Sequence, residues 1–326
     1  MDVLSGIIIA LSLVILANIV VKRQRPAEIR LFEWALFLIN IPLILQGALH
    51  IFLPEQQLTE LNIGIATQSS GFVLLGIGLW GAVICYRPLR EWLAQWLPIN
   101  PQSPVHTLAL ILSGYLIGNP FLIIAEGGLE TLADSAVSVE VIDIILQQLL
   151  FALLAFLGVG LFFRRSNQAL QERLGLERPT PQQLLVGMRW IPILVILQAA
   201  IGAIWFTVNP EQVQQLDDIS TTLLGDVNSL WEWFALALSA GIGEELLFRG
   251  ALQPVLGLWF TAVLFAASHI QYGLTPATLA VFIIAIVLGI IRQRTNTTVA
   301  ILVHFGYDFV IGLLALLATY LEPLAR

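Results

Sequence analysis

The amino-acid sequence predicts an all-α fold, a polytopic bundle of transmembrane helices. Of its 326 residues, 58% are hydrophobic and 11% are charged, and the mean hydropathy is +0.87. In a soluble domain about a quarter of the residues carry charge. The apolar residues also gather in runs of about 20, the length that an α-helix needs to cross a bilayer. Composition and run length together predict an integral, multi-pass membrane protein.

About ten such runs are present, and we expect eight to ten membrane spans. The eighth and ninth runs are short for a full crossing. The first run is followed by the basic stretch "KRQR", the reverse of the order in a cleavable signal peptide, so we expect it to be retained. The runs lie at 3–21, 31–53, 70–86, 105–124, 143–163, 184–208, 230–254, 258–270, 276–291 and 297–321.

The basic residues predict an orientation, because Lys and Arg are enriched in cytoplasmic loops. With both chain ends outside, ten spans place every basic residue except Arg326 in an inner loop or at the inner end of a span. The predicted outer loops at 126–143 and 209–220 are acidic instead. The inner loop at 87–97 has the apolar spacing of an amphipathic surface helix, with Arg90 and Glu91 on its polar side.

Charge and motif content exclude several classes of function. The net charge of −7 argues against a nucleic-acid partner. The single cysteine, Cys85, excludes an internal disulfide or a multi-cysteine metal site. The single lysine, Lys22, excludes a Ser–Lys dyad, and neither a G-x-S-x-G elbow nor an H-E-x-x-H helix is present. The expected partners are the lipid bilayer and a membrane-associated protein or peptide, and the oligomeric state stays open.

The last four predicted spans contain six ionisable side chains. Each costs about 2.5–3.5 kcal/mol at the centre of a membrane helix, so we expect them to share one polar site. Counting along the helices places three of them about 12–18 Å from the cytoplasmic helix ends. By contrast, Gln147 and Gln148 are expected to make ordinary helix–helix hydrogen bonds. The six are Glu244, Glu245, Arg249, His269, His304 and Asp308.

Helical spacing predicts how these side chains pair. Glu245 and Arg249 are four residues apart and can form an ion pair, which leaves Glu244, about 100° away, free to face a cavity. His304 and Asp308 are a second pair of this kind. A glutamate near a histidine can deprotonate a water molecule, and a second histidine can stabilise an oxyanion. The pattern therefore favours a hydrolase of amide bonds that uses a glutamate-activated water.

The same residues resemble the CPBP family of intramembrane proteases, which includes CAAX prenyl proteases and bacteriocin-processing (Abi) proteins. Three motifs carry the resemblance, in order, and it extends over about residues 170–322. The motifs are E-E-x-x-x-R at Glu244, Glu245 and Arg249, F-x-x-x-H at Phe265 and His269, and a variant of H-x-x-x-N at His304 and Asp308.

The resemblance implies an intramembrane endopeptidase with a role for each motif. Glu244 and His269 would activate the water, and Glu245 and Arg249 would brace the site. His304 and position 308 would form the oxyanion side. Here Asp308 replaces the commoner Asn, and an ionised Asp cannot donate a hydrogen bond. We therefore expect it to orient His304 or to favour its protonated form.

The resemblance also divides the chain and leaves alternatives. Residues 1–142 would be accessory transmembrane helices, and residues 143–326 the protease domain, with its core at about 228–322 and its active site opening toward the cytoplasm. A metal-free site without a cofactor is favoured, with zinc on Glu244, His269 and His304 as the alternative. A non-proteolytic scaffold or bacteriocin-immunity protein is a second possible function. A proton- or ion-coupled transporter is the third, disfavoured because no inverted repeat is evident.

Overall fold

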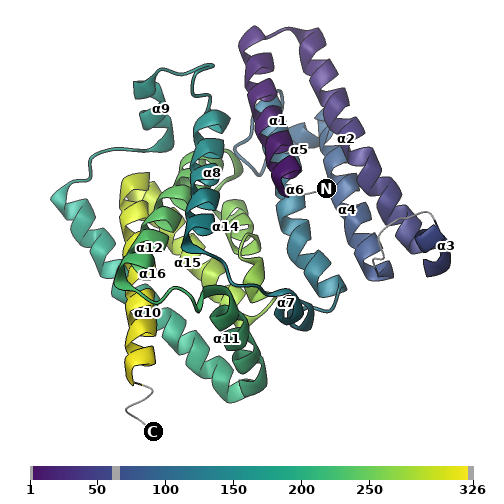
Figure 1. Cartoon of the computed structure of the whole chain (residues 1–326). Helices are drawn as coiled ribbons and strands as arrows, with labels where there is room; N and C mark the ends of the chain where they lie inside the picture. Colours follow the sequence, from purple (N-terminus) through teal and green to yellow (C-terminus); the bar gives the residue numbers. More distant parts are fainter. Residues whose placement is uncertain (1–2, 61–66, 322–326) are drawn as a thin grey trace.

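The computed structural model describes residues 3–60 and 67–321, and this part of the chain is helical without a β-strand (Figure 1). The element η1 is a π-helix and η2 is a 3₁₀-helix. In chain order the helices are α1 (Val3–Arg23), α2 (Pro26–Phe52), α3 (Glu55–Glu60), α4 (Gln68–Ile84), α5 (Arg87–Leu93), α6 (Pro104–Ala125), α7 (Leu129–Ser135), α8 (Val141–Val159), α9 (Asn167–Leu174), α10 (Pro181–Val208), α11 (Pro210–Leu224), α12 (Leu230–Glu244), η1 (Glu245–Leu252), α13 (Gln253–Leu256), α14 (Leu258–Ala267), η2 (Ile270–Tyr272), α15 (Pro276–Arg294) and α16 (Thr297–Leu321).

The predicted polytopic bundle is confirmed, with about eight spans, the lower end of the expected eight to ten. Among the described residues, seven helices are long and apolar enough to cross a membrane, or eight if α4 and α5, bent by 93°, form one span. The expected spans 230–254 and 258–270 are not single membrane-length α-helices. The first changes to a π-helix after Glu244, and the second is the 10-residue helix α14. Gly257, with φ of +79°, makes the turn between them.

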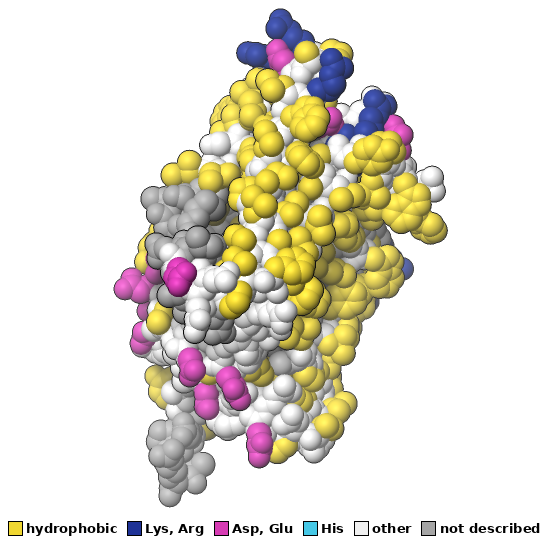
Figure 2. All heavy atoms as spheres, turned by 90° about the vertical axis from the view of Figure 1, so that its right-hand side faces the viewer, with side chains coloured by type: hydrophobic (Ala, Val, Ile, Leu, Met, Phe, Trp, Pro, Cys, Tyr) yellow, Lys and Arg dark blue, Asp and Glu magenta, His cyan; other side chains and the backbone are white. Residues whose placement is uncertain are grey.

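Charge separates along the long axis of the bundle. Figure 2 shows Lys and Arg side chains at one end, Asp and Glu toward the other, and a band of hydrophobic side chains between them. The basic end contains the connection between α1 and α2, where Lys22 and Arg23 close α1. Arg326, the one exception to the predicted charge pattern, lies outside the described residues. That the basic end faces the cytoplasm stays a prediction.

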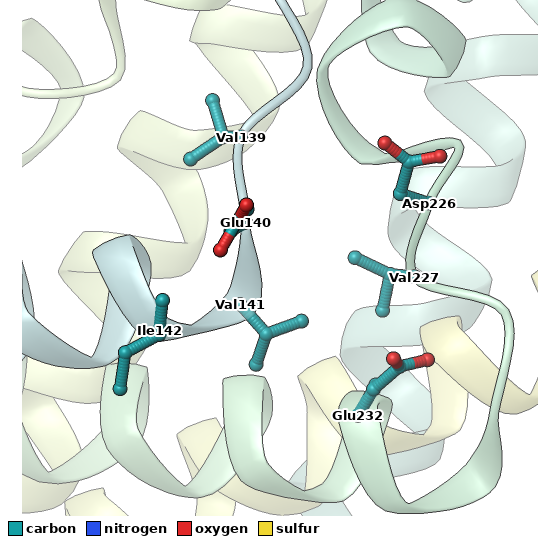
Figure 3. A pocket seen from close by; sticks show the side chains of 7 residues that line it. All are labelled: Val139, Glu140, Val141, Ile142, Asp226, Val227 and Glu232. Atoms are coloured by element: carbon teal, nitrogen blue, oxygen red, sulfur yellow. The ribbon is translucent and has the colours of Figure 1, made fainter.

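A hollow of about 320 Å³ lies between the start of α8 and the start of α12 (Figure 3). Three carboxylates line it, those of Glu140, Asp226 and Glu232. Glu232, however, accepts hydrogen bonds from the backbone N–H and the hydroxyl of Ser229, in a capping box that begins α12. The polar groups of this hollow therefore serve in part to start the helix that leads to Glu244.

A helix is present within the expected segment 87–97, as α5 (Arg87–Leu93), but the prediction for Arg90 is wrong. Its side chain is 1% exposed, and its Nη2 lies 2.5 Å from Oε1 of Glu33 on α2. Its Nε also donates to the carbonyl oxygen of Pro101 at 2.9 Å. The 93° bend turns this side of α5 inward, which the spacing of apolar residues does not reveal.

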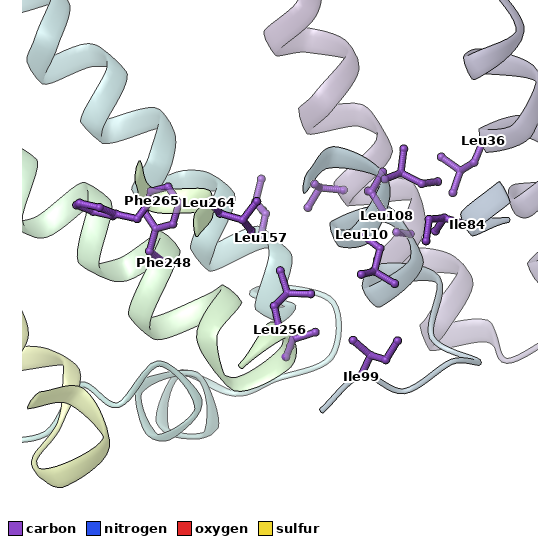
Figure 4. Packing of buried hydrophobic residues seen from close by; sticks show 14 of the residues in the cluster. Leu36, Ile84, Ile99, Leu108, Leu110, Leu157, Phe248, Leu256, Leu264 and Phe265 are labelled. Carbon is purple, nitrogen blue, oxygen red and sulfur yellow. The ribbon is translucent and has the colours of Figure 1, made fainter. Parts of the chain in front are cut away.

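One apolar cluster joins the N-terminal helices to the rest of the molecule (Figure 4). It includes Leu108 and Leu110 of α6, Leu157 of α8, and Leu264 and Phe265 of α14. A polar contact follows the same boundary, because Asn18 of α1 donates to the carbonyl oxygen of Leu157 at 2.9 Å. Helices α1 and α6 thus contact α8 and α14 directly. The domain boundary at residue 142 stays a prediction.

Removing Arg90 is expected to destabilise the bundle, because Glu33 would lose its buried partner. Arg90→Leu should lower the free energy of unfolding in detergent micelles by about 3 kcal/mol or more. The matched control is Arg87→Leu on the same helix, whose ion pair with Glu91 is exposed; its change should stay within about 0.5 kcal/mol. Equal effects of the two substitutions would contradict the structural role of Arg90.

Candidate active site

Glu244 is the last residue of α12, and its side chain lies inside the bundle, with the residue 8% exposed. Its Oε1 accepts a hydrogen bond from Nε2 of Gln148 on α8 at 3.0 Å. Its Oε2 is buried without a hydrogen-bond partner among the described residues and lies 3.8 Å from Nε2 of His269. One carboxylate oxygen is therefore anchored, and the other is left open toward a histidine.

His269 lies in the turn between α14 and η2, beyond the end of the helix in which the sequence placed it. Its Nδ1 is 2.8 Å from the carbonyl oxygen of Phe265, one turn earlier. Because a carbonyl oxygen can only accept, this contact assigns the proton to Nδ1. In the neutral ring, Nε2 then presents its lone pair toward Glu244.

Glu245 begins a second polar cluster and is fully buried. Its Oε1 lies 3.0 Å from Nη1 of Arg249 and 2.9 Å from Nδ1 of His304. Nε2 of His304 lies 3.3 Å from Oδ2 of Asp308. An imidazolium donates from both nitrogens and satisfies both carboxylates, whereas a neutral ring donates to one. Both ion pairs expected from helical spacing are present, and Glu245 links them.

Phe265 connects the two polar clusters. The guanidinium carbon of Arg249 lies 4.1 Å from the centroid of its ring, within the range of a cation–π contact. The ring centroids of His269 and His304 lie 4.8 Å and 5.8 Å from that of Phe265. Phe265 is 2% exposed. The aromatic residue of F-x-x-x-H therefore holds both imidazoles and the arginine in place.

The π-helix η1 begins at Glu245, and π-turns are frequent at functional sites. Pro254, just beyond it, has no N–H to donate to Gly250, four residues earlier. Arg173 of α9 supplies that bond, from Nη1 to the carbonyl oxygen of Gly250 at 2.7 Å. Arg292 of α15 likewise donates to the carbonyl oxygen of Arg249 at 3.3 Å.

Arg173 and Arg292 thus support the site from the basic end of the bundle. Burial is the main cause that lowers the pKa of Arg173 to about 10, and the cations of Arg165 and Arg292 act in the same direction. Arg173 nevertheless keeps its charge at neutral pH, because this value lies well above 7. Its hydrogen bonds to the carbonyl oxygens of Gly250 and Ala251 in η1 therefore remain charge-assisted.

The sequence did not assign three of these supporting residues to the site. Gln148 was expected to make an ordinary helix–helix bond, and Arg173 and Arg292 were read only as inner-loop charges. For Arg173 the signal was Pro254, which leaves the carbonyl oxygen of Gly250, four residues earlier, without its usual helical donor. No pattern along the chain identifies Gln148, because its partner is 96 residues away.

The zinc ligands considered from the sequence do not converge. The described residues contain no group of three or more His, Cys, Asp or Glu side chains placed to hold a metal ion. Both nitrogens of His304 face carboxylates, whereas Nε2 of His269 is open toward Glu244. The set Glu244, His269 and His304 therefore does not fit a three-ligand zinc site in this arrangement.

Comparison with known proteins identifies the segment that carries the site. Residues 226–310 match the family described as type II CAAX prenyl endopeptidase Rce1-like. This match contains all three motifs and confirms the family resemblance drawn from them. A protein of Bacillus subtilis (strain 168) named "Uncharacterized protein YpbD" is 40% identical over 78 residues, 23% of this chain and 41% of that protein. The matched region thus spans less than half of that relative. No solved structure matches.

Removing one partner of the buried ion pair Glu245–Arg249 is expected to destabilise the protein more than replacing both partners. Arg249→Met should lower the free energy of unfolding in micelles by about 3–5 kcal/mol, because it removes one partner of a buried carboxylate. In the double variant Glu245→Gln/Arg249→Met, most of that loss should be recovered. A double variant as unstable as Arg249→Met would show that the ion pair is not what stabilises this region.

Proposed function

We propose that this protein, whose residues 226–310 belong to the Rce1-like family, is an intramembrane endopeptidase that cleaves a membrane-associated protein or peptide. The observation that carries the proposal is the free Oε2 of Glu244, 3.8 Å from Nε2 of His269. This distance exceeds a direct hydrogen bond but suits one bridging water molecule. A water held there could donate one hydrogen to the carboxylate and the other to the imidazole.

Glu244 would act as the general base. As the bridging water attacks the carbonyl carbon of the scissile peptide, its proton passes to Oε2 of Glu244, and Glu244 then delivers it to the leaving amine. The bond between Nδ1 of His269 and Phe265 keeps Nε2 directed at the water. Glu244 thus deprotonates the water, and His269 helps to orient it.

The second cluster would stabilise the negative charge of the tetrahedral intermediate. Nδ1 of His304 is bound to Glu245 at 2.9 Å, whereas its contact to Asp308 through Nε2 is longer, at 3.3 Å. The N–H at Nε2 could therefore turn in part toward a developing oxyanion. Asp308 would orient the ring and favour its imidazolium form, in place of the direct donation that an Asn at this position would make.

The supporting contacts favour a site near the cytoplasm, at the basic end of the bundle. Arg173 and Arg292, from α9 and the end of α15, bind the carbonyl oxygens of η1. Lys and Arg mark cytoplasmic segments, so a substrate would be cut close to the inner membrane surface. A metal-free mechanism is favoured because both ring nitrogens of His304 already have carboxylate partners, which leaves Glu244 and His269 as the remaining pair.

Glu244→Gln is expected to abolish cleavage while the protein still folds, because an amide cannot accept the proton of the water. The measurement is proteomics of membrane fractions from cells in which the variant replaces the parent protein. One or more membrane-associated precursors should accumulate uncleaved. If the peptide profiles of variant and parent are indistinguishable, the non-proteolytic scaffold or immunity role becomes the better interpretation.

Two controls accompany this experiment. Thermal unfolding of Glu244→Gln in micelles should match that of the parent protein, which excludes a loss of fold. Parent membranes incubated with a metal chelator should still cleave the accumulated precursor. Loss of cleavage on chelation, restored by zinc, would favour the metal-dependent alternative. An uncoupler of the proton gradient should not change cleavage, whereas it would inhibit a proton-coupled transporter.

Asp308→Asn is expected to retain cleavage and to change its dependence on pH. Without the carboxylate at 3.3 Å, the imidazolium of His304 loses part of its stabilisation. The alkaline limb of the pH–activity profile should therefore lie at a lower pH in the variant than in the parent protein. The measurement is the rate of precursor cleavage across a pH series in isolated membranes. Complete inactivity of this variant would contradict the orienting role given to Asp308.

A further inference from the structure

Gln148 connects a helix outside the family segment to the reacting carboxylate. It lies in the middle of α8, which packs against α12, and it is 5% exposed. Because an ionised carboxylate only accepts, the amide nitrogen must be the atom that faces Glu244, and it does so at 3.0 Å. Residues 226–310 contain Glu244 but not its anchor.

The backbones of α8 and α12 approach each other closely at this point. A Cβ on Gly243 would lie 2.5 Å from the carbonyl oxygen of Gln148 and 2.6 Å from its Oε1. The amide therefore rests directly against the α12 backbone, in space that any other residue at 243 would fill. A side chain at position 243 would therefore displace the amide of Gln148 from its place beside Glu244.

The anchored oxygen decides what the free oxygen can do. The terminal torsion of a glutamate is broad, so an unanchored carboxylate would rotate between several orientations. The bond from Gln148 holds Oε1 and leaves Oε2 as the oxygen that faces His269, at 3.8 Å. The Oε1 of Gln148 itself is buried without a partner among the described residues, which is unexpected for an amide that serves only to join two helices.

We infer that Gln148 is a positioning residue for catalysis: it holds the carboxylate of Glu244 so that the free oxygen is aimed at the water. This inference rests on the proposed endopeptidase function. It also gives α8, which precedes the family segment, a part in the reaction, and α8 in turn packs on α1 through the apolar cluster of Figure 4.

The test compares Gln148→Leu with Gln147→Leu in cells, by the precursor proteomics described for Glu244→Gln. Gln147 is adjacent on α8 but exposed, so its variant controls for a change of the helix. Gln148→Leu should accumulate the same precursors as Glu244→Gln, with a cleavage rate about 10²-fold below the parent, the usual effect of a misplaced catalytic group. Gln147→Leu should match the parent.

A second variant distinguishes a positioning role of Gln148 from a purely structural hydrogen bond to Glu244. In Gln148→Glu the new carboxyl group can donate to Glu244 only in its protonated form, whereas two ionised carboxylates at this distance repel each other. Membranes from these cells should cleave their accumulated precursor after a shift from neutral to mildly acidic pH, and not before. Loss of a merely structural bond would give no such acid rescue.

Infrared spectroscopy detects the hydrogen bond between Gln148 and Glu244 without a substrate. The carboxyl band of Glu244, assigned by its loss in Glu244→Gln, should shift in Gln148→Leu and stay unchanged in Gln147→Leu. Parent-like cleavage in Gln148→Leu, an unshifted band, or no acid rescue in Gln148→Glu would each overturn the inference. If Glu244→Gln itself leaves the profile unchanged, the endopeptidase proposal has failed, and the inference falls with it for that separate reason.

Discussion

The buried carboxylate of Glu245 is the group on which the arrangement of the site depends. An anion removed from water is stable only when cations or donors surround it, and Glu245 meets Arg249 at 3.0 Å and His304 at 2.9 Å. These contacts join η1 to α16. Arg249, held by Glu245, lies over the ring of Phe265, whose carbonyl oxygen in turn binds His269. A single buried charge thus fixes the positions of both histidines.

The change from α-helix to π-helix lies between two adjacent glutamates that contact different helices. Glu244 closes α12 and faces α8, whereas Glu245 opens η1 and faces α16. The altered turn leaves backbone carbonyls that need outside donors, and Arg173 and Arg292 provide them from the basic end of the bundle. The segment that contains Glu245 and Arg249 is therefore tied to helices at the basic end of the bundle, although these two charged residues are 0% and 1% exposed.

The first helices have a structural relation to the site that family comparison does not show. The matched segment, 226–310, holds all the motif residues. The anchor of Glu244 comes from α8, and the apolar cluster that supports α8 and α14 extends into α1 and α6. A bilayer contributes no hydrophobic driving force between helices, so close packing and interhelical polar contacts of this kind determine their positions.

The sequence by itself determined the class of fold and the motif pairs. Composition and run length suffice for a helical membrane bundle, and spacing of four residues suffices for Glu245 with Arg249 and His304 with Asp308, because both are local properties of a helix. The number of spans lies at the lower end of the eight to ten expected, since apolar runs do not reveal a π-turn, a 93° bend or a half-length helix. The inward turn of Arg90 and the contact of Gln148 with Glu244 were decided only by the tertiary structure. Both depend on how helices distant in sequence cross, and no periodicity along one helix contains that information.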